Sequence, residues 1–315
     1  MHAATLPLHT LAPSQPLRLP STEQGLRYAM TYWSAAARSL FGEHRVRSAA
    51  AGRYATAFEM SDALRQRWHD LFTDHRGGVP VGCPLLYSQS VGTLLYARLF
   101  ADLGINLRHL LHLKHSVTHP LGTAAYLAAG RQVLACRVKR CVRAGPARVL
   151  VLLETQLTDE QGRTVAMVED GFMVRNVPLA DVAAAEPDRV LLRELMDLRR
   201  RRTAIDSAAS TARRAWLPIA PDLAQRFGRV SGDLNPIHTG GLCSRLLGTE
   251  CASVQGLYLR NRVVRKLGHW GLAPERFEIT FTSPAYVGQT LQLRQHGPAF
   301  EVVDGQDRLV AHGQC

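Results

Sequence analysis

The chain carries two copies of one unit, and this internal repeat limits its fold more than any other feature. Matched residues in the two copies are each separated by 164 positions, as in the pairs Gly92 and Gly256, Gly104 and Gly268, and Pro120 and Pro284. Between the two glycines of each copy, apolar residues recur at helical spacing, and a glycine is suited to the C-terminal cap of a helix. The sequence therefore predicts a buried helix over residues 91–104 and another over residues 256–268.

Each predicted helix is followed by β-rich sequence. Leu113–Thr118 and Phe277–Thr282 occupy equivalent places, and both run into a Thr-x-Pro segment. Further strands are predicted at residues 128–142, 148–157, 164–174, 290–296, 299–303 and 309–312. One helix with several antiparallel strands in each copy predicts an α+β fold, in which a sheet wraps around a central helix.

The composition indicates that the protein does not insert into a membrane. The 315 residues, 46% of them hydrophobic, suffice for one large core or for two of roughly 150 residues each. No stretch approaches the roughly 20 consecutive apolar residues of a membrane helix, and the first residues have prolines where a signal peptide is apolar. Six scattered cysteines do not resemble a disulfide framework. We therefore expect a cytoplasmic location.

The chain is strongly basic, with a formal net charge of +12. Such a charge attracts an anionic partner, whether nucleic acid, coenzyme A or an acidic carrier protein, and does not choose among them. The sequence has no zinc-finger spacing, RNP-like strand or basic heptad helix, so we expect no nucleic-acid partner. Arg199–Arg202 is either a solvated part of a linker or a contact for the phosphates of coenzyme A or a carrier.

The densest group of polar residues runs from Ser231 to His238 and reads Ser-Gly-Asp-Leu-Asn-Pro-Ile-His. Asn235 is a good helix N-cap and Pro236 suits the first helical position, so a helical turn is predicted to begin here. The dipole at a helix N-terminus disfavours an imidazolium, which would keep His238 able to accept a proton. Asp233 just precedes the cap, so its carboxylate and the imidazole can flank one water molecule.

This segment resembles the motif of the MaoC-like dehydratases and (R)-specific enoyl-CoA hydratases, Ser-Gly-Asp-x-Asn-Pro-x-His. The resemblance implies a double hotdog fold and catalysis by Asp233 and His238, without a metal or redox cofactor. The remaining fixed positions of the motif are supporting residues: Ser231, Gly232, Asn235 and Pro236. The resemblance extends more weakly over residues 216–312.

The reaction of this family also needs a hydrogen-bond donor for the oxygen of the thioester enolate. In the family the donor is a glycine amide at the start of the central helix, usually within a His-Gly pair. This chain has Gln255-Gly256 instead. The Gly256 amide is our candidate donor, with Gln255 beside it. Alternatively, Gly256 only permits close packing of the helix on the sheet.

Residue pattern and composition, together with the two hotdogs that the resemblance implies, divide the chain into four segments. Residues 1–20 are a disordered N-terminus, 21–177 a degenerate N-terminal hotdog with an added N-terminal helix, 178–210 a linker, and 211–315 the catalytic hotdog. The first copy repeats the Asp and His spacing of the motif at Asp70 and His75. It lacks the Asn-Pro pair, so we interpret these two residues as a coincidence or a decayed site.

The expected activity is reversible hydration of a trans-2-enoyl thioester to the (R)-3-hydroxyacyl thioester, the reaction of a hydro-lyase. The partner is then an acyl-CoA or an acyl carrier protein thioester, and a homodimer is an open alternative to a monomer. Two other functions stay open. They are a hotdog acyl-thioesterase and a hotdog that binds an acyl chain or carrier without turnover.

Two further groups of residues invite a metal interpretation. Four histidines crowd one segment: His109, His112, His115 and His119. Alternation along a strand places His112 and His115 on opposite faces, and no acidic or cysteine partner lies near them in sequence. Cys136 and Cys141 fit packing positions in a strand. We therefore expect no metal site.

Overall fold

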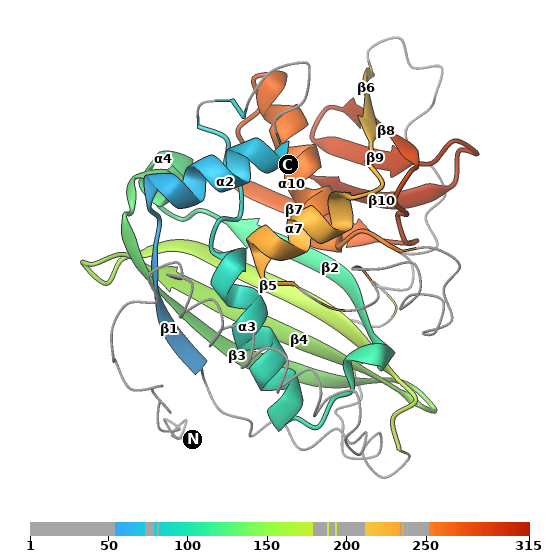
Figure 1. Cartoon of the computed structure of the whole chain (residues 1–315). Helices are drawn as coiled ribbons and strands as arrows, with labels where there is room; N and C mark the ends of the chain where they lie inside the picture. The colour runs from blue at the N-terminus through green and yellow to red at the C-terminus, as the bar shows by residue number, and fades with distance from the viewer. Residues whose placement is uncertain are drawn as a thin grey trace.

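The structure of the chain, a computed structural model, describes residues 54–72, 79–80, 82–178, 188, 193, 212–233, 235, 238 and 252–315 (Figure 1). The strands are β1 (Tyr54–Glu59), β2 (Leu110–Thr118), β3 (Arg131–Gly145), β4 (Arg148–Thr158), β5 (Thr164–Arg175), β6 (Arg213–Pro218), β7 (Arg276–Phe281), β8 (Thr290–His296), β9 (Ala299–Val303) and β10 (Leu309–Gln314). In the described residues they form one ten-stranded sheet, in the order β1-β3-β4-β5-β2-β7-β10-β9-β8-β6.

The sheet has two halves that meet where β2 pairs with β7 in antiparallel register, with Lys114 opposite Thr280 and Thr118 opposite Arg276. The order β1-β3-β4-β5-β2 of the first half matches β6-β8-β9-β10-β7 of the second, strand for strand. The predicted pair of repeated units is therefore confirmed, and the two units share one continuous sheet.

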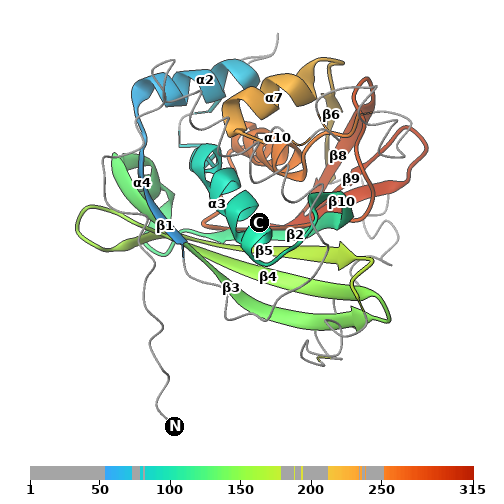
Figure 2. The same ribbon diagram turned by 60° about the horizontal axis from the view of Figure 1, so that its bottom comes forward.

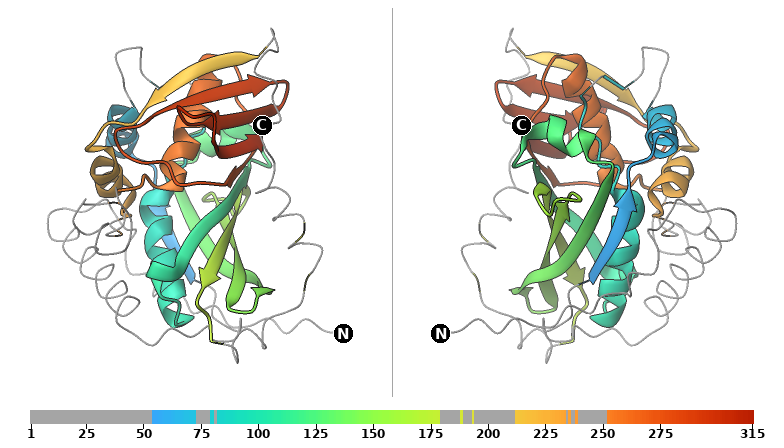
Figure 3. Two further views of the ribbon diagram at one scale, coloured as in Figure 1. Left: turned by 90° about the vertical axis from the view of Figure 1, so that its right-hand side faces the viewer. Right: turned by 90° about the vertical axis from the view of Figure 1, so that its left-hand side faces the viewer.

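The helices are α2 (Asp62–Phe72), α3 (Gln89–Asp102), α4 (Gly122–Ala128), α7 (Leu223–Ser231) and α10 (Gly256–His269), with a 3-10 turn η1 (Leu107–His109). Figure 2 shows α2, α3, α7 and α10 on the same side of the sheet. Figure 3 shows α3 running along the strands of the first half and α10 lying with those of the second. Each half thus has its own central helix, as predicted.

One of the two central helices ends at the predicted glycine, and the other does not. In the first copy Gly104 follows α3 with a positive φ of 73°, and the Ile105 amide reaches back to the Phe100 carbonyl at 2.8 Å. This is the expected glycine cap. In the second copy the prediction was wrong, because Gly268 lies inside α10 and Gly271, with φ 77°, takes the left-handed position beyond the helix.

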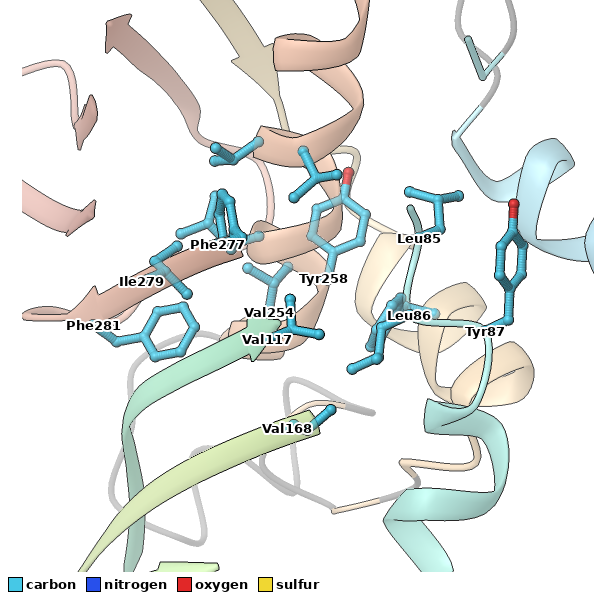
Figure 4. Close-up of a cluster of buried hydrophobic side chains, with 14 of the residues drawn as sticks. Leu85, Leu86, Tyr87, Val117, Val168, Val254, Tyr258, Phe277, Ile279 and Phe281 are labelled. Atoms are coloured by element: carbon cyan, nitrogen blue, oxygen red, sulfur yellow. The ribbon is translucent and has the colours of Figure 1, made fainter. Parts of the chain in front are cut away.

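The two halves share a hydrophobic core at their junction. Figure 4 shows side chains of this core from both halves: Val117 of β2, Ile279 and Phe281 of β7, Tyr258 of α10, and Leu86. Among the described residues 60 hydrophobic side chains are buried, and these five are among them. Most of the 60 belong to one cluster. At about 25 cal/mol per Å² of apolar surface, burial of this kind is the main term that stabilises the sheet–helix layers.

Several predictions fall on residues outside the described ranges. These are the disordered N-terminus 1–20, the added helix that begins near residue 21, and nearly all of the linker 178–210. Among the helices that the structure describes, none is long and apolar enough to cross a membrane. Within the same ranges the cysteines are free thiols: Cys83, Cys136, Cys141 and Cys315.

A buried histidine in the first half makes the stability of the fold depend on pH. His119 is 2% exposed, and its ring packs against Tyr126. Burial, and next the charge of Arg260, lower the pKa of His119 to about 4 from 6.5. In the unfolded chain His119 is protonated as the pH falls below about 6.5, whereas in the folded chain it is protonated only near pH 4. The free energy of unfolding therefore decreases as the pH falls between these two values.

We expect the substitution His119→Gln to remove part of this pH dependence. Between pH 6.5 and pH 5 the histidine should account for about 1.5 kcal/mol of the fall in the free energy of unfolding. Urea unfolding of both proteins at several pH values measures this. An equally steep fall in the variant would contradict the assignment.

Candidate active site

The segment that resembles the MaoC motif begins at the end of α7. This helix buries Phe227, whose ring meets Trp68 of α2 edge to face at a centroid distance of 5.7 Å. The helix stops at Gly232, which has φ 74° and ψ 3°. Only glycine adopts this left-handed conformation at little cost, so Gly232 turns the chain out of the helix and presents Asp233.

Two hydrogen bonds to nearby residues hold Asp233, one through its backbone amide and one through its carboxylate. Its amide donates to the hydroxyl oxygen of Ser231 at 3.2 Å, and Ser231 is fully buried. Its carboxylate Oδ1 accepts from the amide of Asn235 at 3.3 Å. Asp233 is itself partly exposed. Ser231 and Asn235, two of the predicted supporting residues, thus each form a hydrogen bond with Asp233, while Pro236 lies outside the described residues.

His238 is in a helical turn, as predicted, and its amide donates to the carbonyl of Asn235 at 2.9 Å. Its ring nitrogen Nδ1 lies 2.7 Å from the backbone carbonyl oxygen of Ser253. A carbonyl only accepts, so Nδ1 carries the proton in this bond. In the neutral imidazole this leaves Nε2 with its lone pair, which is the form that a general base requires.

The segment 253–255 ties both ends of the motif to the start of α10. Ser253 fixes His238, as above. Gln255, which is 2% exposed at the N-cap of α10, donates from Nε2 to the carbonyls of Ala224 in α7 at 3.2 Å and of Asp233 at 3.4 Å. Since Gly256 follows directly, the structure brings Asp233, His238 and Gly256 to one place. The sequence did not predict that Ser253 holds His238, because every residue has a backbone carbonyl and the residue type does not show which one accepts a hydrogen bond.

Gly256 is the first residue of α10, so its amide lies in the helical turn whose N–H groups have no acceptor within the helix. The structure also supports the packing explanation for this glycine. A Cβ at this position would lie 3.0 Å from the ring of Phe281 in β7, closer than side chains normally pack. A larger residue here would require the Phe281 ring to shift.

Asp70 differs from Asp233 in its surroundings. It lies within α2, on an exposed position, and its carboxylate accepts from Nε2 of Gln66 at 2.7 Å. Asp233, in contrast, follows the glycine that ends α7. His75 falls outside the described residues.

The expectation that strand alternation separates His112 from His115 was wrong. The pairing register of β2 with β5 shifts between His112 and Lys114, which is the mark of a β-bulge. Both imidazoles consequently reach the same carboxylate oxygen of Asp170 in β5.

Residues 205–310 match the family model of the MaoC like domain. No curated protein matches the sequence. HtdX of Mycobacterium tuberculosis has a TM-score of 0.60 at 14% identity, over 83% of this chain and 98% of that one.

Two further solved structures are similar. A MaoC-like dehydratase from Phytophthora capsici has a TM-score of 0.51 at 20% identity, over 67% of this chain and 70% of that one. The full-length peroxisomal multifunctional enzyme type 2 of Drosophila melanogaster has a TM-score of 0.54 at 16% identity, over 83% of this chain and 48% of that one. At these identities the likenesses show the fold, which is a double hotdog.

Proposed function

The C-terminal part of the chain is a MaoC-like domain, and from this premise we propose that it adds water reversibly to trans-2-enoyl thioesters, giving (R)-3-hydroxyacyl thioesters. The observation that carries the proposal is the hydrogen bond from His238 Nδ1 to the Ser253 carbonyl. In the neutral imidazole it leaves Nε2 as the acceptor, in the same motif as the Asp233 carboxylate. Residues 211–315 are then the catalytic hotdog, and residues 21–177 the half without the catalytic pair.

In the proposed mechanism Asp233 and His238 hold one water molecule over C3 of the substrate. As the water oxygen bonds to C3, the π electrons of the double bond move toward the thioester carbonyl, and a proton from the water passes to His238 Nε2. That proton is then delivered to C2 of the enolate. The Gly256 amide donates to the enolate oxygen, where the positive end of the α10 dipole favours the developing negative charge.

The substrate carrier is coenzyme A or an acyl carrier protein, since both are anionic and the chain has a net charge of +12. A panel of enoyl thioesters from four to sixteen carbons on both carriers tests the proposal. We expect loss of the enoyl absorbance without release of free thiol. Release of free thiol with the double bond intact would favour an acyl-thioesterase, and tight binding without turnover would favour a binding protein.

Gly228 offers a test of how Asp233 is positioned. A Cβ on Gly228 would lie 2.7 Å from the backbone carbonyl oxygen of Asp233, so Gly228→Ala must displace this residue. A displacement near 1 Å is expected to lower kcat for hydration by about 100-fold. The measurement is the rate of loss of the enoyl absorbance.

Gly92→Ala in α3 is the matched control, because a Cβ there meets nothing within 4 Å. It should retain full activity and gain slightly in stability from the better helix propensity of alanine. Undiminished activity of Gly228→Ala would show that the position of Asp233 does not limit the reaction.

A further inference from the structure

A second polar cluster, which does not include the proposed catalytic pair, lies in the first half of the sheet. His112 Nε2 and His115 Nδ1 lie 2.8 and 2.9 Å from the same oxygen, Oδ1 of Asp170. The three possible ligand atoms lie within 4.8 Å of one another. His115 and Asp170 are at most 1% exposed, whereas the side chain of His112 is 16% exposed. The cluster is therefore buried, with His112 on its accessible side.

The backbone is bent to make this cluster. In regular β-structure His112 and His115, three residues apart, face opposite sides of the sheet. The bulge in β2 leaves Leu113 without a partner residue in β5 and turns the two imidazoles toward Asp170. Bulges often re-aim a side chain at a functional site.

The carboxylate of the cluster is ionised and held by an outer group. Burial raises the pKa of Asp170, but the neighbouring His115 and His112 lower it more and keep it well below its ordinary range. The hydroxyl of Tyr96 in α3 donates to the other carboxylate oxygen, Oδ2, at 2.6 Å, and lies 3.1 Å from the hydroxyl of Thr155. Metal-binding carboxylates are commonly held by such hydrogen bonds.

His115 Nδ1 and His112 Nε2 both donate to the Asp170 carboxylate. His112 Nε2 also lies 3.0 Å from the Lys114 carbonyl oxygen. A bound metal ion would therefore displace the proton of each nitrogen. Among the described residues, the other nitrogen of His115, Nε2, has no hydrogen-bond partner, so the bond to Asp170 alone sets the tautomer. His112 is packed between two rings instead. Phe172 stacks on it at 4.5 Å and Phe281 lies at 5.1 Å, and these contacts fix the plane of the imidazole.

We propose that His112, His115 and Asp170 form a binding site for a divalent transition metal ion such as Zn²⁺. Two imidazoles and one carboxylate are a ligand set that suits Zn²⁺ and Fe²⁺, and the buried position limits competition from water. The separations of 2.8 and 2.9 Å to Oδ1 are those of hydrogen bonds, so the ligand atoms move apart by a few tenths of an ångström around the ion. This proposal does not depend on the proposed hydratase activity.

The test is titration of the full chain, treated with a chelator and dialysed, with Co²⁺, followed by its visible absorbance, and with Zn²⁺ in competition. We expect one Co²⁺ per chain. Tyr96→Phe should weaken binding by about 10- to 100-fold, as loss of an outer-shell partner does. His112→Ala and Asp170→Asn remove a ligand and should weaken it more.

His109→Ala is the matched control, because this histidine lies in the same segment and outside the cluster, and it should bind like the wild type. Zn²⁺ should raise the Tm of the wild type and of His109→Ala. If Asp170→Asn does not fold, binding by His112→Ala decides the test, because the side chain of His112 is partly exposed and its removal should leave the fold intact. Absence of binding by the wild type, or equal binding by His112→Ala, would show instead that the cluster is a hydrogen-bonded part of the core.

Discussion

Asp233→Asn and His238→Ala should each lower kcat for the hydration of an enoyl thioester by about 100- to 10,000-fold. The asparagine amide that replaces the Asp233 carboxylate could still orient water but would no longer stabilise the positive imidazole that forms when His238 accepts the proton. Alanine at position 238 removes the nitrogen that accepts the proton. Both side chains are only partly buried, so neither change should unfold the protein. The rate of loss of the enoyl absorbance measures the effect.

Asp70→Asn is the matched control for this prediction. Asp70 has the same residue type and a related place in the repeat, yet it is exposed on α2. The variant should hydrate substrate at the wild-type rate. Equal losses in Asp70→Asn and Asp233→Asn, or undiminished hydration in both Asp233→Asn and His238→Ala, would remove the basis for the proposed catalytic pair.

Trp68→Ala should cost about 3 to 5 kcal/mol in the free energy of unfolding. Trp68 is fully buried in α2, where its ring packs against Phe72, Tyr87 and Phe227. Its removal leaves a cavity between α2 and α7, the helix that ends at the Asp233 turn. Denaturant unfolding followed by circular dichroism measures the loss.

Trp216→Ala is the control of the same residue type. Trp216 is 59% exposed on β6, at the edge of the sheet, so its removal should cost about 1 kcal/mol or less. A similar loss from the two substitutions would mean that Trp68 is not packed as the structure shows.

The repeat made the fold predictable, whereas three short helices of the described residues, α2, α4 and α7, were missed. Strand alternation and the apolar stripes of α3 and α10 are long enough to be seen in the sequence. In contrast, α7 has only nine residues, with Gly228 inside it, and its buried face rests mainly on Leu223 and Phe227. Helices this short are stabilised by packing, here against α2, more than by their own sequence. α2 was missed for the same reason.

The candidate site was predictable where it depends on residue type and not where it depends on the backbone. The motif identified Asp233 and His238, and the glycine at the start of α10 followed from the resemblance. The carbonyl of Ser253 that holds His238, and the bonds from Gln255 to α7 and to Asp233, depend on tertiary contacts. Likewise the β2 bulge that joins His112 to Asp170 breaks the regular alternation on which the sequence interpretation relied.

The most direct test of the central claim is to follow the oxygen of water into the product. The wild-type chain is incubated with a trans-2-enoyl-CoA in water labelled with oxygen-18, and the products are analysed by mass spectrometry. We predict one labelled oxygen on C3 of an intact 3-hydroxyacyl-CoA. Label in a free carboxylate with release of coenzyme A, or no labelled product at all, would contradict the proposed hydration.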